Sequence, residues 1–173
     1  NTLALLYKAQ GVQDKAERLL LSVVETRQQT LGSRHPSTLT SMNILAGVYL
    51  EQGRFEEAEI LYGKVLEKRD QTLGEQHPNT LLTLNNLSWM RLQDLNKAPT
   101  AHFDRLLQNW TSPTDWKHHW ARLGRALCEA LKSSDFTCSE AVLADLIALL
   151  GEEHERVEKG REKIAIIRKR VWN

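Results

Sequence analysis

The sequence contains few of the residues that interrupt helices, with 4 prolines and 9 glycines among 173 residues. Long stretches consist instead of Leu, Ala, Glu, Lys, Arg and Gln, which keep most of their side-chain freedom in a helix. Hydrophobic residues make up 41% and charged residues 26% of the chain, which is ordinary for a soluble globular protein and argues against a disordered or fibrous one. The composition therefore predicts an all-α fold.

The sequence also has few cysteines and no large excess of charge of one sign. Cys128 and Cys138 are the only cysteines, and neither a CxxC spacing nor a cluster of other ligands accompanies them. Neither a zinc site nor a disulfide framework is indicated, so a reducing, cytoplasmic setting is expected. The formal net charge of +1 gives no overall field that would attract nucleic acid or an anionic membrane.

Long hydrophobic runs are absent as well. The longest apolar stretches, such as 19–24 and 141–150, are too short to span a bilayer or are interrupted by charge, so no transmembrane helix is predicted. The chain opens at Asn1 without an initiator Met or a signal-like segment, inside an apolar-periodic run that no capping residue precedes. We therefore expect the sequence to be a fragment of a longer protein.

What the sequence does contain is an internal repeat. The segment Leu-Gly-Ser-Arg-His-Pro-Ser-Thr at 31–38 recurs as Leu-Gly-Glu-Gln-His-Pro-Asn-Thr at 73–80, an offset of 42 residues. The same offset relates Asn43 to Asn85 and Gly11 to Gly53. Self-similarity at a fixed period of this length is the signature of a repeat architecture.

Each unit of the repeat reads as two amphipathic helices, over about 36–51 and 55–72. Gly53 can adopt the left-handed conformation that ends the first helix, and the Leu-Gly pair before His-Pro is expected to close the second helix in the same way. Pro36 and Pro78 suit a first helical position, where the missing N–H costs nothing. The unit is therefore predicted to be a helical hairpin.

In the most regular unit, the repeated positions are Thr38-Leu39, Asn43, Leu45-Ala46, Tyr49, Gln52-Gly53, Phe55 and Glu57-Ala58-Glu59. These residues resemble the tetratricopeptide repeat, in the 42-residue variant found in kinesin light chains, and the resemblance covers roughly residues 1–110. It implies an all-α, right-handed α-α superhelix: a tetratricopeptide solenoid of about four helix pairs with a C-terminal capping helix.

Past Leu92 the repeat becomes irregular. The glycine expected in the turn is replaced by Asp94 or Leu95, and Pro99 implies a shortened second helix. A junction at 111–114, a first-helix pattern at 120–127 and another Leu-Gly at 150–151 indicate a fourth unit followed by a charged last helix. We predict a single solenoid domain over 1–173, with repeats at about 1–35, 36–77, 78–112 and 113–151 and a capping helix at 152–172.

Residues that could carry out chemistry are present but lack the arrangement that chemistry needs. His35 and His77 recur with the repeat, whereas a catalytic histidine is needed once, so we interpret them as junction residues. His118 and His119 are adjacent in the sequence, which is not the one-turn spacing of the histidines in a zinc motif. His154 is followed by Glu155, as in the HExxH motif of zinc hydrolases, but Glu158 stands where that motif has its second histidine. The sequence also has no phosphate-binding loop and no nucleophile elbow. We predict no enzymatic activity, no metal and no cofactor.

Two further features allow a binding role. Trp110, Trp116 and Trp120 crowd the irregular junction; we interpret them as packing residues, with an exposed aromatic platform as the alternative. The segment 156–173 carries seven Lys or Arg against two Glu and could contact nucleic acid or acidic lipid. Because capping helices are routinely charged, we predict that neither nucleic acid nor a membrane is a partner.

The resemblance also implies where a partner would bind, because the first helices of successive tetratricopeptide units line a concave groove. The positions that form stripes along this groove are Asn1, Lys8, Asn43, Gly47, Leu50, Glu51, Asn85, Trp89, Leu92 and Gln93. An asparagine offers both a donor and an acceptor, so a ladder of asparagines can hold the backbone of an extended peptide. The alternative is that they hydrogen-bond the adjacent helix. Leucine and tryptophan would add apolar pockets.

From these features we expect a protein-protein interaction scaffold that binds an extended peptide or a partner domain in its groove and catalyses nothing. The expected ligand is a protein or peptide. The alternative is a regulatory or sensor repeat domain that controls an effector, such as a Ser/Thr kinase or an ATPase, in the same polypeptide.

Overall fold

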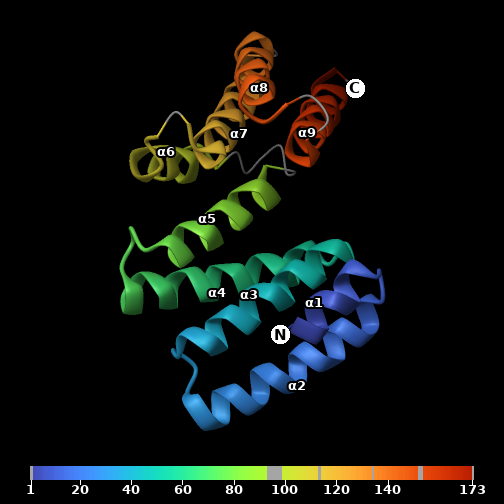
Figure 1. Cartoon of the computed structure of the whole chain (residues 1–173), viewed down its shortest axis with the longest axis vertical. Helices are drawn as coiled ribbons and strands as arrows, with labels where there is room; N and C mark the ends of the chain where they lie inside the picture. The colour runs from blue at the N-terminus through green and yellow to red at the C-terminus, as the bar shows by residue number, and fades with distance from the viewer. Residues whose placement is uncertain (1, 93–98, 113, 134, 152–153, 173) are drawn as a thin grey trace. The chain divides into compact units, whose positions relative to one another are not determined.

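The computed structural model describes residues 2–92, 99–112, 114–133, 135–151 and 154–172 (Figure 1). These residues form nine α-helices and no strand, so the predicted all-α fold is confirmed. The helices are α1 (Thr2–Ala9), α2 (Gln13–Leu31), α3 (Pro36–Glu51), α4 (Phe55–Leu73), α5 (Pro78–Arg91), α6 (Thr100–Asn109), α7 (Trp116–Ser133), α8 (Thr137–Leu150) and α9 (Glu155–Trp172).

The chain divides into two compact units, Asn1–Met90 and Arg91–Asn173. The first unit contains α1 to α4 and nearly all of α5, and the second contains α6 to α9. The single domain and the repeat boundaries predicted from the sequence stay predictions. Among the helices that the structure describes, none is both long and apolar enough to cross a membrane.

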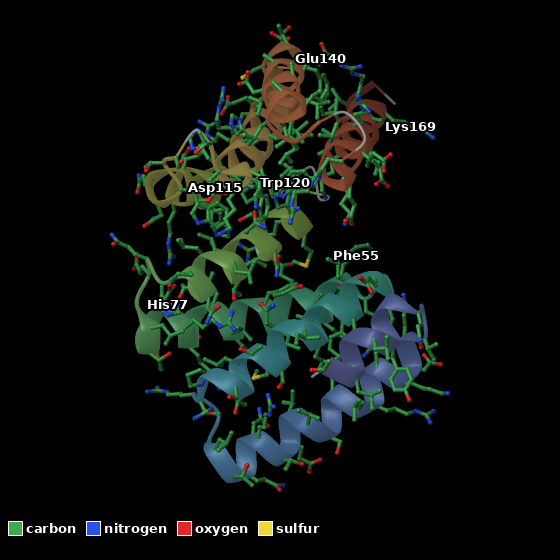
Figure 2. The ribbon with its side chains drawn as sticks, viewed as in Figure 1. Phe55, His77, Asp115, Trp120, Glu140 and Lys169 are labelled. Carbon is green, nitrogen blue, oxygen red and sulfur yellow. The ribbon has the colours of Figure 1, made fainter. Side chains whose placement is uncertain are left out.

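The repeated histidines start helices. His35 precedes α3, and its Nδ1 accepts the backbone N–H of the residue two positions on, over 3.2 Å. His77 before α5 and His154 before α9 do the same, each over 3.1 Å. Asp115 has this role before α7, where its Oδ1 accepts a backbone N–H over 2.9 Å (Figure 2). These side chains satisfy donors that a helix N-terminus leaves unpaired. The interpretation of His35 and His77 as junction residues is confirmed.

Glycines end both helices of the repeat, but in two different conformations. Gly53 has φ 75° and Gly11 has φ 72°, in the left-handed region that was predicted for the first helix. Gly32 and Gly74 each have φ 90° with ψ 159°, which is an extended ψ and not the left-handed helical conformation predicted for them. The predicted backbone conformation of these two glycines was therefore wrong. A glycine is still required at both positions, because other residues rarely adopt a positive φ with an extended ψ.

Alanine and branched side chains fill the core of the first unit. One cluster, to which α1 to α4 contribute, contains Ala4, Ala16, Leu20, Val24, Leu39, Met42, Leu45, Val48 and Val65. A second cluster joins α3, α4 and α5 through Ala46, Ala58, Tyr62, Leu87 and Met90. Each helix pair therefore buries apolar side chains against the next pair, as expected of a repeat whose units do not form a core alone.

In the second unit, α6, α8 and α9 all contact α7. α6 has 10 residues against 19 in α2 and in α4, which is the shortening that Pro99 predicts. Trp120 is buried, and Trp116 stacks against Arg156 of α9 with 3.8 Å between the ring centroid and Cζ. These two tryptophans therefore serve packing, in agreement with the interpretation made from the sequence.

Candidate functional site

The candidate site is the side of α3 and α5 that carries the predicted asparagines. On α3, Asn43, Gly47 and Glu51 follow one another at intervals of four residues, which places them on one side of the helix. On α5, Asn85 and Trp89 occupy the positions equivalent to Asn43 and Gly47. Both asparagines are half-buried. Their side chains are therefore partly accessible to a ligand.

The side chain of Asn43 is held by α5. The hydroxyl oxygen of Thr83 lies 3.1 Å from Asn43 Oδ1 and also 3.1 Å from the backbone oxygen of Asn79. The Nδ2 group of Asn43, which can donate two hydrogen bonds, has no partner among the described residues. Both interpretations of the asparagines thus apply to this residue: its acceptor contacts the adjacent helix, and its donors are available to a ligand.

Asn85 differs from Asn43 in its acceptor. Its Oδ1 is buried and has no hydrogen-bond partner within the described part of the chain. A buried acceptor without a hydrogen bond is unfavourable by about 1–3 kcal/mol. The equivalent asparagines of the two helices are therefore in different states, one with its acceptor satisfied and one without.

The other predicted groove residues differ in exposure. Leu50 is half-buried and Glu51 is exposed, whereas Gly47 is buried. Trp89 and Leu92 are also buried, with 6% and 1% of their surface exposed. Asn1, Gln93 and the side chain of Lys8 lie outside the described residues.

An arginine of α4 supports the contact between Asn43 and Thr83. Arg69 Nη1 donates to Thr83 Oγ1 over 2.6 Å and to the backbone oxygen of Asn79 over 2.8 Å, and Nη2 donates to Thr40 Oγ1 over 3.2 Å. Only 3% of Arg69 is exposed, and burial lowers its pKa. In the preceding unit, Nη1 of Arg27 makes the corresponding backbone and hydroxyl contacts at 2.9 and 2.8 Å. In both helix pairs, an arginine of the second helix thus fixes the start of the first helix of the following pair.

Sequence reasoning missed several residues of this surface. Thr83 and Arg69 position Asn43, and Leu82, three residues before Asn85, is an exposed hydrophobic side chain on α5. A usable signal was present, because the offset of 42 residues pairs Arg27 with Arg69. Because these arginines recur at the repeat offset, the sequence could have predicted that their polar contacts recur as well.

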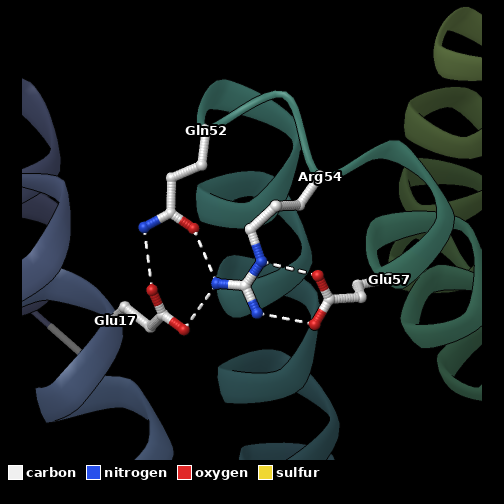
Figure 3. A network of polar contacts seen from close by, with 4 residues as sticks. All are labelled: Glu17, Gln52, Arg54 and Glu57. Atoms are coloured by element: carbon white, nitrogen blue, oxygen red, sulfur yellow. Dashed lines mark hydrogen bonds and ion pairs between the residues drawn. The ribbon is translucent and has the colours of Figure 1, made fainter.

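A second polar network ties the turn after α3 to the preceding helix pair (Figure 3). Arg54 Nη1 and Gln52 Nε2 donate to the two oxygens of Glu17 on α2, over 2.7 and 2.8 Å. Arg54 also donates to both oxygens of Glu57, each over 2.6 Å, and stacks on Tyr49 with 4.1 Å to the ring centroid. Because these groups pair with one another, the network joins helices and does not form a ligand site.

Cys128 of α7 and His102 of α6 are titratable groups outside this surface. No group of three or more His, Cys, Asp or Glu side chains among the described residues could hold a metal ion. Burial raises the pKa of the Cys128 thiol to about 11, which disfavours the thiolate form that acts as a nucleophile. Burial, with Arg91 and Arg105 nearby, lowers the pKa of His102.

Comparison with known proteins agrees with the helix pairs and their caps. The sequence model of the tetratricopeptide repeat matches residues 1–71 and 42–103. The chain belongs to the tetratricopeptide repeat family. Proteins with this repeat generally act as protein-interaction scaffolds, and the repeat is a non-catalytic type of fold. No curated protein matches the chain.

Several solved structures share the fold of this tetratricopeptide repeat protein. BtubC (BKLC) from P. vanneervenii is 22% identical, with a TM-score of 0.70 over 94% of this chain and 62% of its own. A point variant of a putative kinesin light chain from Podosopora anserina, with nearly identical TPR-like repeats, is 23% identical, with a TM-score of 0.74 over 97% of this chain and 82% of its own. Another structure of that P. anserina protein is 20% identical, with a TM-score of 0.72 over 97% of this chain and 91% of its own.

The chain therefore spans less than two thirds of the length of BtubC, since it covers 62% of that protein. The tetratricopeptide repeat predicted from the sequence is confirmed. The likeness to the putative kinesin light chain structures, at 20% and 23% identity, is one of fold.

Proposed function

We propose that this tetratricopeptide repeat protein binds an extended peptide of a partner protein along the side of α3 and α5 that carries Asn43 and Asn85. The observation that carries the proposal is the state of the Asn43 amide. Thr83 engages its Oδ1 over 3.1 Å, while its Nδ2 group has no partner among the described residues. The amide is oriented before a ligand arrives, and its donors are unused.

An oriented amide suits the backbone of an extended peptide. Such a peptide presents carbonyl oxygens at regular intervals, and the Nδ2 groups of Asn43 and Asn85 would each donate to one of them. Because Thr83, which Arg69 contacts, already engages the Asn43 side chain, little conformational entropy is lost when the ligand binds. Contacts of this kind contribute affinity without selecting a side chain.

Apolar side chains near the asparagines would provide the anchors. Leu50 of α3 is half-buried and Leu82 of α5 is 47% exposed. Trp89 and Leu92 are buried, so we assign the apolar contacts of the ligand to Leu50 and Leu82. Anchors of this type dominate the affinity of peptide complexes. The expected ligand is an uncharged or weakly charged segment with an apolar or aromatic residue.

The test is selection of peptide binders from a display library with the intact chain, followed by affinity measurement. We expect Asn43→Ala with Asn85→Ala to weaken the binding of the selected peptides at least about fivefold, because each of the two lost hydrogen bonds is worth about 0.5–1.5 kcal/mol. The control is Asn79→Ala, which removes an exposed asparagine side chain from the same helix. Binding that is equally strong in the double variant and in the control would exclude the asparagines from the site.

A further inference from the structure

The two asparagines of the candidate site present the same part of their side chains to a ligand. Asn43 Oδ1 lies 3.1 Å from the hydroxyl oxygen of Thr83 on α5, and Asn85 Oδ1 is buried. Neither Nδ2 group has a hydrogen-bond partner among the described residues, and neither is one of the buried polar atoms without a partner. Both Nδ2 groups therefore reach the solvent, whereas the two Oδ1 atoms are engaged or buried.

The hydroxyl group of Thr83 is oriented by Arg69 of α4. Arg69 Nη1 donates to Thr83 Oγ1 over 2.6 Å, so the hydroxyl hydrogen must point elsewhere. The two oxygens within its reach are Asn43 Oδ1 and the backbone oxygen of Asn79, each at 3.1 Å. The Asn79 oxygen already accepts from Arg69 over 2.8 Å, which favours donation to Asn43. The Asn43 oxygen is therefore occupied before a ligand binds.

An asparagine that offers only its Nδ2 group reads the carbonyl oxygens of a peptide and not its N–H groups. An ordinary residue placed against such a site buries a backbone N–H without an acceptor, which is unfavourable. Proline carries no N–H. A polyproline II helix also leaves its carbonyl oxygens free, because it has no internal hydrogen bonds, and a preformed conformation loses little entropy on binding.

The charge of the first helices agrees with a ligand of this kind. Glu51 is the only charged residue of α3, and Arg91 is the only one of α5, so neither helix places a charge within one turn of Asn43 or Asn85. We propose that the ligand carries prolines opposite these two asparagines, in a polyproline II conformation; this inference rests on the proposed peptide-binding function. The partner is a proline-containing, weakly charged segment of another protein.

The test compares two display libraries of short peptides, screened with the intact chain. One library fixes proline at every third position, which is the repeat of a polyproline II helix, and the other fixes alanine there. We expect binders from the proline library. Exchange of their fixed prolines for alanine should raise the Kd at least about fivefold, because unsatisfied N–H groups are then buried. Exchange for N-methylalanine, which also lacks the N–H, should change the Kd by at most about twofold.

Thr83→Val supplies the matched variant, because it frees Asn43 Oδ1 to accept an N–H of the ligand. The ratio of the alanine-peptide Kd to the proline-peptide Kd should fall towards one in Thr83→Val and stay unchanged in Asn79→Ala. Equal ratios in the two variants would overturn the inference. If Thr83→Val does not fold, Asn43→Asp, which offers acceptors only, should weaken the proline peptides more than the alanine peptides, and an equal loss would overturn it.

The libraries also separate this inference from the proposed function. Peptides that lose affinity in Asn43→Ala with Asn85→Ala, but bind equally well with proline or alanine, would overturn the inference alone. Peptides that are indifferent to both asparagines, or the absence of binders from both libraries, would overturn the proposed function and the inference with it.

Discussion

Arg54 Nη1 lies 2.7 Å from Glu17 Oε1, and this ion pair joins the turn after α3 to α2 of the preceding helix pair (Figure 3). Gln52 donates to the other oxygen of Glu17 over 2.8 Å. Burial raises the pKa of Glu17, but the hydrogen bonds from Arg54 and Gln52 outweigh that effect, and the pKa lies below the ordinary value of 4.5. The charged carboxylate is therefore the form that the folded state prefers.

This preference predicts a pH-dependent contribution to stability. A carboxylate whose pKa is lowered by folding stabilises the folded state above its unfolded-state pKa, and the contribution is lost as the pH falls through the folded-state pKa. We expect Glu17→Gln to lower the melting temperature at pH 7, and we expect the difference from the wild type to disappear as the pH falls below about 4.5. Circular dichroism melts at several pH values measure this. Glu25→Gln, an exposed carboxylate on the same helix, is the control, and an equal effect of both variants would contradict the prediction.

Arg69 is predicted to be a major stabilising residue of the first unit. Arg69→Ala removes three hydrogen bonds and leaves a cavity, so the free energy of unfolding should fall by about 3 kcal/mol. Arg69→Met keeps most of the volume and should cost only about half as much. Urea unfolding followed by circular dichroism separates the two values. Arg18→Ala, at an exposed position of α2, should change stability by at most about 0.5 kcal/mol; a larger loss there than in Arg69→Ala would refute the assignment.

The histidine caps can be tested against the aspartate that replaces them before α7. His77→Ala should destabilise the chain by about 1 kcal/mol, because the cap of α5 is lost. His77→Asp should retain the wild-type stability, since Asp115 accepts a backbone N–H in the same way and a carboxylate also favours a helix N-terminus. Thermal melts of the two variants distinguish these outcomes. If alanine were as stable as aspartate, the cap would contribute nothing.

Gly124 and Gly63 should respond to alanine with opposite signs. A Cβ at position 124 would lie 2.2 Å from Cε1 of the buried Phe103 ring, whereas a Cβ at position 63 of α4 meets nothing within 4 Å. Gly124→Ala should therefore destabilise by about 1–3 kcal/mol, and Gly63→Ala should stabilise by about 0.5–1 kcal/mol through helix propensity. Urea unfolding of the two variants measures both changes.

Adding Phe103→Leu to Gly124→Ala provides the check on that mechanism. The smaller side chain relieves the clash, so the double variant should lose less stability than the two single variants lose together. We expect the difference, measured as the coupling energy of a double-mutant cycle, to be about 0.5–3 kcal/mol. Additive effects would show that the ring does not cause the loss.

Much of the first unit could be predicted because its signals are local. The bounds of α3, Pro36–Glu51, agree with those expected from the sequence, since a proline, a cap and a glycine act within a few residues of where they stand. The repeat itself was also visible, because equivalent residues recur at a fixed offset. The conformation of Gly32 and Gly74 was not predictable in this way, since a positive φ is compatible with more than one ψ.

The polar contacts of the candidate site depended on tertiary structure. Asn43 was identified from its position in the repeat, but its partner Thr83 and the support of Arg69 come from two other helices. Whether a side chain of the predicted groove is accessible also depends on what packs against it, as the burial of Trp89 shows.

Leu3 and Leu45 show this division most clearly. They are the same residue at the same position of the repeat, and the residue pattern alone assigns both to the apolar side of a first helix. It does not distinguish their environments, yet Leu45 is buried and Leu3 is exposed once the helices have packed. The reason is that burial is a property of the neighbouring helix and not of the residue.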